Sequence, residues 1–145
     1  MLFIFDLDGT TIDSSHRQNT LPDGSLNLDA WVRNNTPEKI AADSLLPMAE
    51  SWKTINRQNH QIVIMTARVV GAADFKFLDD NRLGYDYIYS RPFGDTTPDD
   101  ILKKKMLDTF VDINDVFLVV DDRDKVVKMW RDLGLNTFQV APGDF

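Results

Sequence analysis

Phe3-Ile4-Phe5-Asp6-Leu7-Asp8-Gly9-Thr10-Thr11 is the stretch of this 145-residue sequence that decides the fold. The apolar run from Leu2 to Phe5 is typical of a strand buried on both faces of a parallel sheet. Asp6 and Asp8 follow one residue apart, so their carboxylates start on one side of the strand, and Gly9 lets the backbone turn. Two acidic groups where a buried strand opens into a loop are costly unless a cation or a reaction uses them. Asp-x-Asp-Gly also occurs in turns and calcium loops, but the further acidic positions of a calcium loop do not follow.

Two later apolar runs also end in polar groups. The run Gln61-Ile62-Val63-Ile64-Met65 predicts a second buried strand and is followed by Thr66-Ala67-Arg68. A hydroxyl at a strand end can hydrogen-bond a phosphate together with backbone N–H groups, although Thr in this position often only caps a helix. The run Val116-Phe117-Leu118-Val119-Val120 is the strongest strand pattern and ends in Asp121-Asp122. One Asp would suit the start of the helix that runs to Leu133, but two are more than capping requires.

These patterns resemble the motifs of the haloacid-dehalogenase superfamily of phosphotransferases. The first motif corresponds to Asp-Leu-Asp-Gly-Thr-Thr at residues 6–11. The resemblance implies that Asp6 is the nucleophile that accepts the phosphoryl group and that Asp8 is the general acid and base. It also implies that Thr66 is the hydroxyl of the second motif and that Asp121-Asp122 is the metal-binding fourth motif.

The third motif of this superfamily is a lysine on a helix that aims it at the phosphoryl group. Residues 99–110 are predicted to be helical and carry Lys103, Lys104 and Lys105 in succession. Three consecutive side chains fan around a helix, so they cannot all face one site. The register with the preceding Gly-Asp-Thr and Asp-Asp segments selects Lys103 as the expected site lysine.

The carboxylates of these motifs require a cation, since three of them cannot sit together and stay ionised without one. Hard oxygen ligands suit Mg²⁺, which retains several waters. The expected ligands are the Asp6 carboxylate, the Asp8 backbone carbonyl and Asp121, with Asp122 bound directly or through water.

Two arginines are candidates for holding the substrate phosphate. Arg17 follows the nucleophile loop, and Arg68 follows the second strand. Lone basic residues on loops are usually solvated, yet an acidic protein that binds a polyanion needs local cations, so we expect both to face the crevice. Groups near the strand ends are expected to contact substrate as well, and these are Gly9, Thr10 and Ala67.

The order of the elements favours a single α/β domain over residues 1–145. Strands and helices alternate, which is typical of a doubly wound parallel sheet, and the resemblance implies a Rossmann-like core. A loop is predicted over 12–27, and short strands are predicted over 87–89 and 137–140. Helices are predicted over 28–34, 37–45, 47–59 and 72–83. Phe75 and Leu78 are expected on the inner face of the helix over 72–83. The insertion within about residues 14–60 is expected to form a small cap and to leave the crevice open.

Composition argues against several classes of protein. No apolar run approaches the roughly twenty residues of a transmembrane helix, and the opening run stops at Asp6, too short for a signal peptide. The sequence has no cysteine, which fits a reducing cytoplasm, and we expect a cytoplasmic location. The formal net charge of -7 argues against a generic, non-specific grip on nucleic acid.

A more specific resemblance extends over nearly the whole chain, to the 3′-phosphatase domain of bacteriophage polynucleotide kinase/phosphatases. It is carried by Arg17, Gly94-Asp95-Thr96, Asp99-Asp100, the segment Val120 to Gly134 and the ending Gln139 to Phe145. It implies a Mg²⁺-dependent enzyme that removes 3′-phosphates from DNA or RNA ends and from nucleoside 3′-monophosphates through an aspartyl-phosphate. The sequence lacks the Gly-x-x-x-x-Gly-Lys-Ser/Thr loop of a kinase, so a kinase or ligase partner is expected to be separate. A phage source, and with it the host cytoplasm, is implied by the resemblance alone.

Two other functions fit parts of the pattern. A small-molecule phosphatase or 5′-nucleotidase would use the same core and motifs. A receiver-type signalling domain also combines carboxylates, Mg²⁺ and a lysine. In a receiver domain, however, the acidic pair follows the first strand and the phosphorylated Asp comes later, whereas here Asp6 and Asp8 come first and the adjacent pair comes late.

Overall fold

A five-stranded parallel sheet forms the centre of the molecule, in a computed structural model that describes residues 1–19 and 21–145. Its strands lie in the order β5-β4-β1-β6-β7. The strands are β1 (Leu2–Phe5), β4 (Gln61–Met65), β5 (Tyr87–Tyr89), β6 (Val116–Asp121) and β7 (Thr137–Gln139). Because the chain moves outward from β1 in both directions, the order reverses between β1 and β6, where open sheets of this kind bind their ligands.

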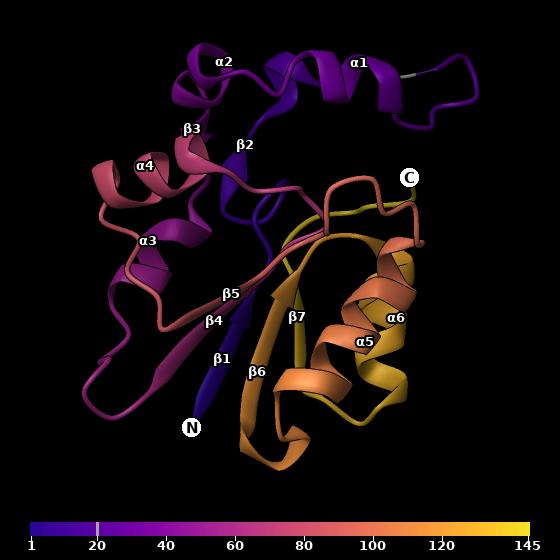
Figure 1. Cartoon of the computed structure of the whole chain (residues 1–145). Helices are drawn as coiled ribbons and strands as arrows, with labels where there is room; N and C mark the ends of the chain where they lie inside the picture. Colours follow the sequence, from indigo (N-terminus) through magenta and orange to yellow (C-terminus); the bar gives the residue numbers. More distant parts are fainter. Residues whose placement is uncertain (20) are drawn as a thin grey trace.

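Helices cover both faces of this sheet, as Figure 1 shows. On one face lie α5 (Asp99–Phe110) and α6 (Asp124–Asp132), and on the other lie α3 (Met48–Lys53) and α4 (Ala72–Asp80). A short 3₁₀ helix, Ile113–Asp115, leads into β6. This is the predicted doubly wound α/β fold. Over the described residues, no helix combines the length and apolar character needed to cross a bilayer.

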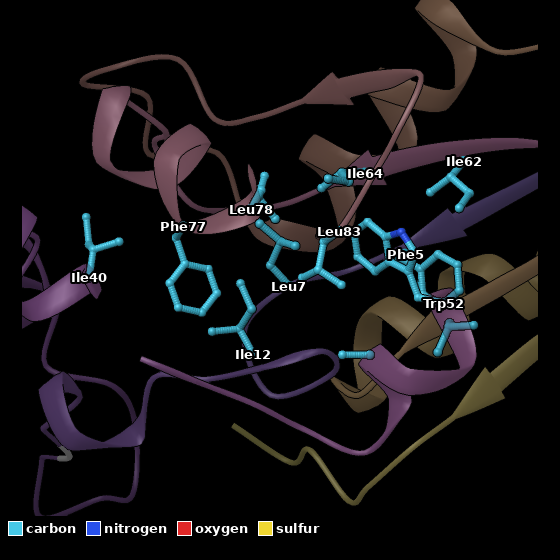
Figure 2. Packing of buried hydrophobic residues seen from close by; sticks show 12 residues of the cluster. Phe5, Leu7, Ile12, Ile40, Trp52, Ile62, Ile64, Phe77, Leu78 and Leu83 are labelled. Atoms are coloured by element: carbon cyan, nitrogen blue, oxygen red, sulfur yellow. The ribbon is translucent and has the colours of Figure 1, made fainter. Parts of the chain in front are cut away.

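The apolar strands form the core because both of their faces are covered. Phe5 pairs in register with Ile64 of β4 and Val120 of β6, and its ring stacks on the indole of Trp52 with centroids 4.9 Å apart. Figure 2 shows these two rings beside each other within the cluster of buried side chains. The indole Nε1–H of Trp52 donates a hydrogen bond to the carbonyl of Gly84 at 2.8 Å. The first strand, which leads into Asp6 and Asp8, is therefore fixed by its two neighbouring strands and by the indole of Trp52.

The segment between β2 (Ile12–Asp13) and β4, which we call the insert (residues 14–60, described over 14–19 and 21–60), lies beyond the carboxyl ends of the strands and along one face of the sheet (Figure 1). It begins after β2 (Ile12–Asp13) with a 3₁₀ helix, Ser15–Arg17, and continues through α1 (Leu28–Arg33), α2 (Pro37–Ala41), β3 (Ser44–Leu45) and α3. The small antiparallel ladder between β2 and β3 joins the insert to the loop that follows Asp6.

Four of the predicted elements differ from the structure in their extent or their buried face. The predicted loop 12–27 contains β2 and a 3₁₀ helix, and the helix predicted over 37–45 ends at Ala41 because Leu45 pairs with Ile12 in the ladder. The helix predicted over 47–59 spans Met48–Lys53 and is followed by hydrogen-bonded turns. On α4 it is Phe77, not Phe75, that packs inward beside Leu78.

Candidate active site

The polar groups that follow the strands meet at one edge of the sheet. Asp6 follows β1, Thr66 follows β4, Asp121 ends β6 and Asp122 follows it, while Lys103 reaches the same place from α5. The backbone N–H of Asp6 donates to the carbonyl of Val120 at 3.0 Å, which extends the pairing of β1 with β6 up to Asp6. All five of these side chains are buried.

Lys103 is the lysine that contacts the carboxylates. Its ammonium group lies 2.8 Å from Asp6 Oδ1 and 2.9 Å from Asp121 Oδ2, and its residue is only 2% exposed. The next residue, Lys104, points outward and pairs with Asp108 on the surface of the helix. The indole of Trp130 donates a further hydrogen bond to Asp121 Oδ2 at 3.2 Å.

Three of the carboxylates are close enough to share one cation. Oxygens of Asp6, Asp121 and Asp122 all lie within 4.8 Å of one another. Burial and the neighbouring carboxylates raise the pKa of Asp6, and the same two causes raise the pKa of Asp122 to about 6. One ammonium group among three buried carboxylates leaves negative charge uncompensated, and oxygen ligands of this kind fit a Mg²⁺ ion.

Asp8 lies in a different electrostatic environment. Arg68 donates to Asp8 Oδ2 from Nε at 3.1 Å and contacts Oδ1 through Nη2, and the hydroxyl of Ser14 donates to Oδ1 at 2.6 Å. Burial alone would raise the pKa of Asp8, but the ion pair and hydrogen bonds outweigh it and hold the pKa below its usual value. The pKa values of the two carboxyl groups of the first motif are thus shifted in opposite directions: that of Asp6 is raised and that of Asp8 is lowered.

Arg68 belongs to a buried network of charges. Its Nη1 donates to Asp74 at 2.6 Å, and its Nη2 lies 3.5 Å from Asp43. Asp43 in turn accepts two hydrogen bonds from Arg17, both at 2.9 Å, and lies 2.7 Å from His16.

Arg17 is buried beside this network. Its side chain is fully buried, and its guanidinium lies 4.4 Å from the centre of the Trp31 ring. The guanidinium donates hydrogen bonds to Asp43 and Asn35 of the insert. Its positive charge also helps to lower the pKa of Asp8. Asp43 thus binds Arg17 in the structure, and the expected contact of Arg17 with the substrate phosphate stays a prediction.

The remaining predicted residues line the same edge. The hydroxyl of Thr10 lies 2.9 Å from Asp6 Oδ2 and 3.2 Å from Asp122 Oδ1, so it links these two carboxylates. The hydroxyl oxygen of Thr66 accepts the backbone N–H of Arg68 at 3.0 Å. Gly9 has φ 79°, and a Cβ on it would lie 2.3 Å from Asp122 Oδ2, so the position requires glycine.

A hollow of about 300 Å³ adjoins this edge. It is lined by residues that follow the first strand, by Leu46 of the insert and by the chain after β7, which are Gly9, Asp13, Ser14, Ser15, Gln18, Leu46, Asp122, Ala141 and Pro142. The hollow therefore lies between the insert and the C-terminal segment, and Asp122 of the carboxylate cluster forms part of its wall.

Sequence reasoning did not find every residue that builds the site. Asp43 and Asp74 carry no motif, and both are buried because they bind arginines. Arg91 also went unnoticed, although it donates to the carbonyl of Ala67 at 2.8 Å and to Asp99 at 2.7 Å. Partners this far apart in sequence give no local signal, because only the fold brings them together.

Comparison with solved structures first defines the class of protein. A predicted phosphatase from Clostridium acetobutylicum superposes with a TM-score of 0.71 and 13% identity, covering 95% of this chain and 83% of the other. A haloacid dehalogenase-like hydrolase from Streptococcus pneumoniae gives 0.65 and 13%, with the same coverage. At this identity the likeness shows the fold, which is that of haloacid-dehalogenase hydrolases.

The family follows from a closer match. The family model for the polynucleotide kinase PNKP phosphatase domain matches residues 1–145, and the chain belongs to this family. Its structure also resembles a chain of the Pnkp1/Rnl/Hen1 complex, with a TM-score of 0.76 and 29% identity over 99% of this chain and 46% of that one. A chain of the Pnkp1/Rnl/Hen1 RNA repair complex gives 0.71 and 29%, over 99% and 43%. The sequence thus spans less than half of these two chains.

Proposed function

We propose that this protein is a Mg²⁺-dependent polynucleotide 3′-phosphatase, which hydrolyses the terminal 3′-phosphate of DNA or RNA ends and also nucleoside 3′-monophosphates. The observation that carries the proposal is the Asp6 carboxylate, held by Lys103 and Thr10 beside Asp121 and Asp122, in a chain of the PNKP phosphatase family. The structures it resembles are named as parts of an RNA repair complex.

In the first step Asp6 attacks the phosphorus atom in line with the leaving 3′-oxygen. A bond forms between the Asp6 carboxylate and phosphorus, the bond from phosphorus to the 3′-oxygen breaks, and Asp8 gives the leaving oxygen a proton. In the second step Asp8 takes a proton from water, which attacks the aspartyl-phosphate and releases inorganic phosphate. Lys103 and Thr66 neutralise and orient the phosphoryl oxygens.

Asp8 has to be protonated for the first step, yet Arg68 holds its pKa low. We infer that Arg68 shifts from Asp8 to the substrate phosphate when substrate binds. Burial would then dominate at Asp8 and favour the protonated acid. The positive charge of Arg68 therefore lowers the pKa of Asp8 before substrate binds and neutralises the substrate phosphate afterwards.

The residues that would hold Mg²⁺ are Asp6, Asp121 and Asp122, together with the backbone carbonyl of Asp8. A divalent ion bound there supplies neutralising charge for the phosphoryl oxygens. The role of Arg17 is to position Arg68 through Asp43. We also propose that the insert is a small cap within a single domain over residues 1–145, and that a kinase or ligase activity comes from elsewhere.

The test is phosphate release from matched oligonucleotides. Purified protein with Mg²⁺ is given the same DNA and RNA sequence with a phosphate at the 3′ end or at the 5′ end, and the corresponding 3′- and 5′-mononucleotides. We expect 3′-phosphates to be preferred by at least about tenfold in kcat/KM. Asp6→Asn should remove activity because an amide cannot accept the phosphoryl group. Preference for 5′-mononucleotides would favour the nucleotidase function instead.

A further inference from the structure

The loop between β5 and α5, residues 90–98, presents an aromatic ring to solvent. Phe93 in this loop is 94% exposed, more than any other large hydrophobic residue in the ranges 1–19 and 21–145. Single exposed apolar side chains are common on proteins, so this exposure alone assigns no role. What distinguishes Phe93 is the way in which its loop is held.

Phe93 occupies the second position of a tight turn. The backbone N–H of Asp95 donates to the carbonyl of Pro92 at 3.0 Å and closes the turn. Gly94 in the third position has φ 80°, which is the conformation of a type II turn. The backbone at Phe93 is therefore fixed, and its ring projects from the tip of the turn.

Arg91 ties this turn to the candidate active site. Its backbone N–H donates to the carbonyl of Arg68 at 3.1 Å, and its Nε donates to the carbonyl of Ala67 at 2.8 Å. Its Nη1 donates to the carbonyls of Thr97 at 2.7 Å and Asp95 at 3.1 Å, on the far side of the turn. One mostly buried guanidinium thus braces both sides of the turn against the residues that follow β4.

A second cation stands at the base of the same loop. Asp99, the first residue of α5, accepts from Arg91 on one carboxylate oxygen and contacts Arg123 through the other. The side chains of Arg91 and Arg123 are 15% and 21% exposed, and both guanidinium groups are paired with Asp99. An exposed ring on a braced loop, with two partly exposed arginines at its base, offers a nucleobase the stacking surface that proteins use for single-stranded nucleic acid.

We propose that Phe93 is a stacking platform for a nucleobase in the 3′-terminal segment of the substrate strand. The inference rests on the proposed 3′-phosphatase function. A phosphate held at Asp6 leaves its nucleoside at the carboxyl edge of the sheet, where the loop 90–98 lies (Figure 1). An aromatic ring binds any base through its π-face, so Phe93 contributes affinity without selecting a sequence.

The test is a double-mutant cycle in which the ring of Phe93 is removed from the protein and one base is removed from the substrate strand. The kcat/KM of the wild-type protein and of Phe93→Ala is measured on a 3′-phosphorylated oligonucleotide and on versions with one abasic site at each of the last three positions. We expect Phe93→Ala to lose about 10- to 100-fold on the intact strand. At one of the three positions, the abasic site should cost the wild-type protein a similar factor and should cost Phe93→Ala almost nothing.

Two further replacements separate stacking from general apolar contact. Phe93→Trp should retain or improve kcat/KM, and Phe93→Leu should lose as much as Phe93→Ala. Phe110→Ala is the matched control, since Phe110 is 58% exposed and lies at the opposite end of α5. It should leave kcat/KM within about twofold of wild type.

Three outcomes would overturn the inference. Unchanged kcat/KM of Phe93→Ala, beside normal wild-type release of 3′-phosphate, would defeat the stacking role alone. A loss that is the same on intact and abasic strands at every position would show that the ring contacts no base. A change of oligomeric state in Phe93→Ala, measured by sedimentation velocity, would assign the ring to a protein contact. Failure of the wild-type protein to release any 3′-phosphate would instead defeat the proposed function itself.

Discussion

The guanidinium of Arg68 contacts both carboxylate oxygens of Asp8, through Nε and through Nη2. This contact holds the pKa of Asp8 down although burial acts to raise it. Asp6, two residues earlier, has the opposite shift because it is buried among other carboxylates. Two carboxyl groups that lie two residues apart after β1 thus have pKa values shifted in opposite directions, as the proposed roles of nucleophile and acid require.

Asp8→Asn should slow hydrolysis in proportion to how much the leaving group needs a proton. On a nucleoside 3′-phosphate, whose leaving group is an alkoxide, we expect kcat/KM to fall by about 10³-fold. On p-nitrophenyl phosphate, whose leaving group is far less basic, the loss should be at least tenfold smaller. Asp23→Asn, in an exposed turn, is the control. Equal losses of Asp8→Asn on both substrates would contradict the acid role.

Lys103→Ala and Lys104→Ala form a matched pair, because the two residues are adjacent in α5 and only one enters the site. Lys103→Ala should lower kcat by about 10²- to 10³-fold, since it removes a charge that stabilises the phosphoryl oxygens. Lys104→Ala should leave kcat within about twofold of wild type and should change the free energy of unfolding by no more than about 0.5 kcal/mol. Phosphate release and urea unfolding check both variants. Near-normal activity of Lys103→Ala would move the site lysine elsewhere.

The metal-free protein should lose stability as pH rises from about 4 to 6. The pKa of Asp122 is raised to about 6 in the folded state, so over this range the folded protein binds more protons than the unfolded chain. Stability from this group is present at low pH and is lost as pH rises through 6. Asp6 acts in the same direction, while Asp8 contributes stability that is lost only in more acidic solution.

Urea unfolding with EDTA, at several pH values, measures this effect. Asp122→Asn should flatten the pH dependence and unfold at higher urea concentration than wild type at pH 7. Mg²⁺ should stabilise the wild-type protein at pH 7 and should stabilise Asp122→Asn less. If the free energy of unfolding of the wild-type protein rises steadily over this pH range, with the same slope in Asp122→Asn, the raised pKa of Asp122 does not affect stability.

The pair formed by Arg17 and Asp43 should be strongly coupled. Asp43→Asn leaves the buried guanidinium without its partner and should cost about 3–5 kcal/mol of stability, as should Arg17→Gln. The double variant should cost much less than the sum of the two. Both single variants should also raise KM for the 3′-phosphorylated strand, because Asp43 helps to fix Arg68. Additive losses of stability would show that the two residues act independently.

Gly9→Ala should weaken the metal site. The added Cβ would lie 2.3 Å from Asp122 Oδ2, so the carboxylate must move, and the positive φ disfavours alanine. We expect the Mg²⁺ concentration for half-maximal activity to rise by about tenfold or more. Gly24→Ala is the control, because Gly24 has a similar φ of 86° and open space around its Cα. If both variants have the same Mg²⁺ requirement, the contact with Asp122 has no effect on the metal.

The amino-acid sequence by itself predicts the buried strands of this protein and the carboxylates that follow them. A buried parallel strand is apolar along its whole length, so β1, β4 and β6 stand out, and carboxylates directly after such strands have few explanations other than a charged ligand. The sequence therefore predicts Asp6, Asp121 and Asp122 as residues that bind a charged ligand. The structure places them within reach of one cation.

The tertiary structure alone decided which cations serve these carboxylates. Three neighbouring lysines are present in α5, and only the packing of this helix shows that Lys103 is the one turned inward. The buried guanidinium of Arg17 has Asp43 as its partner, which no local sequence pattern indicates. A helical or extended pattern records which face of an element is apolar, but the partner of a buried charge can lie anywhere in the chain. Sequence therefore determined where charge collects, and the fold determined how it is neutralised.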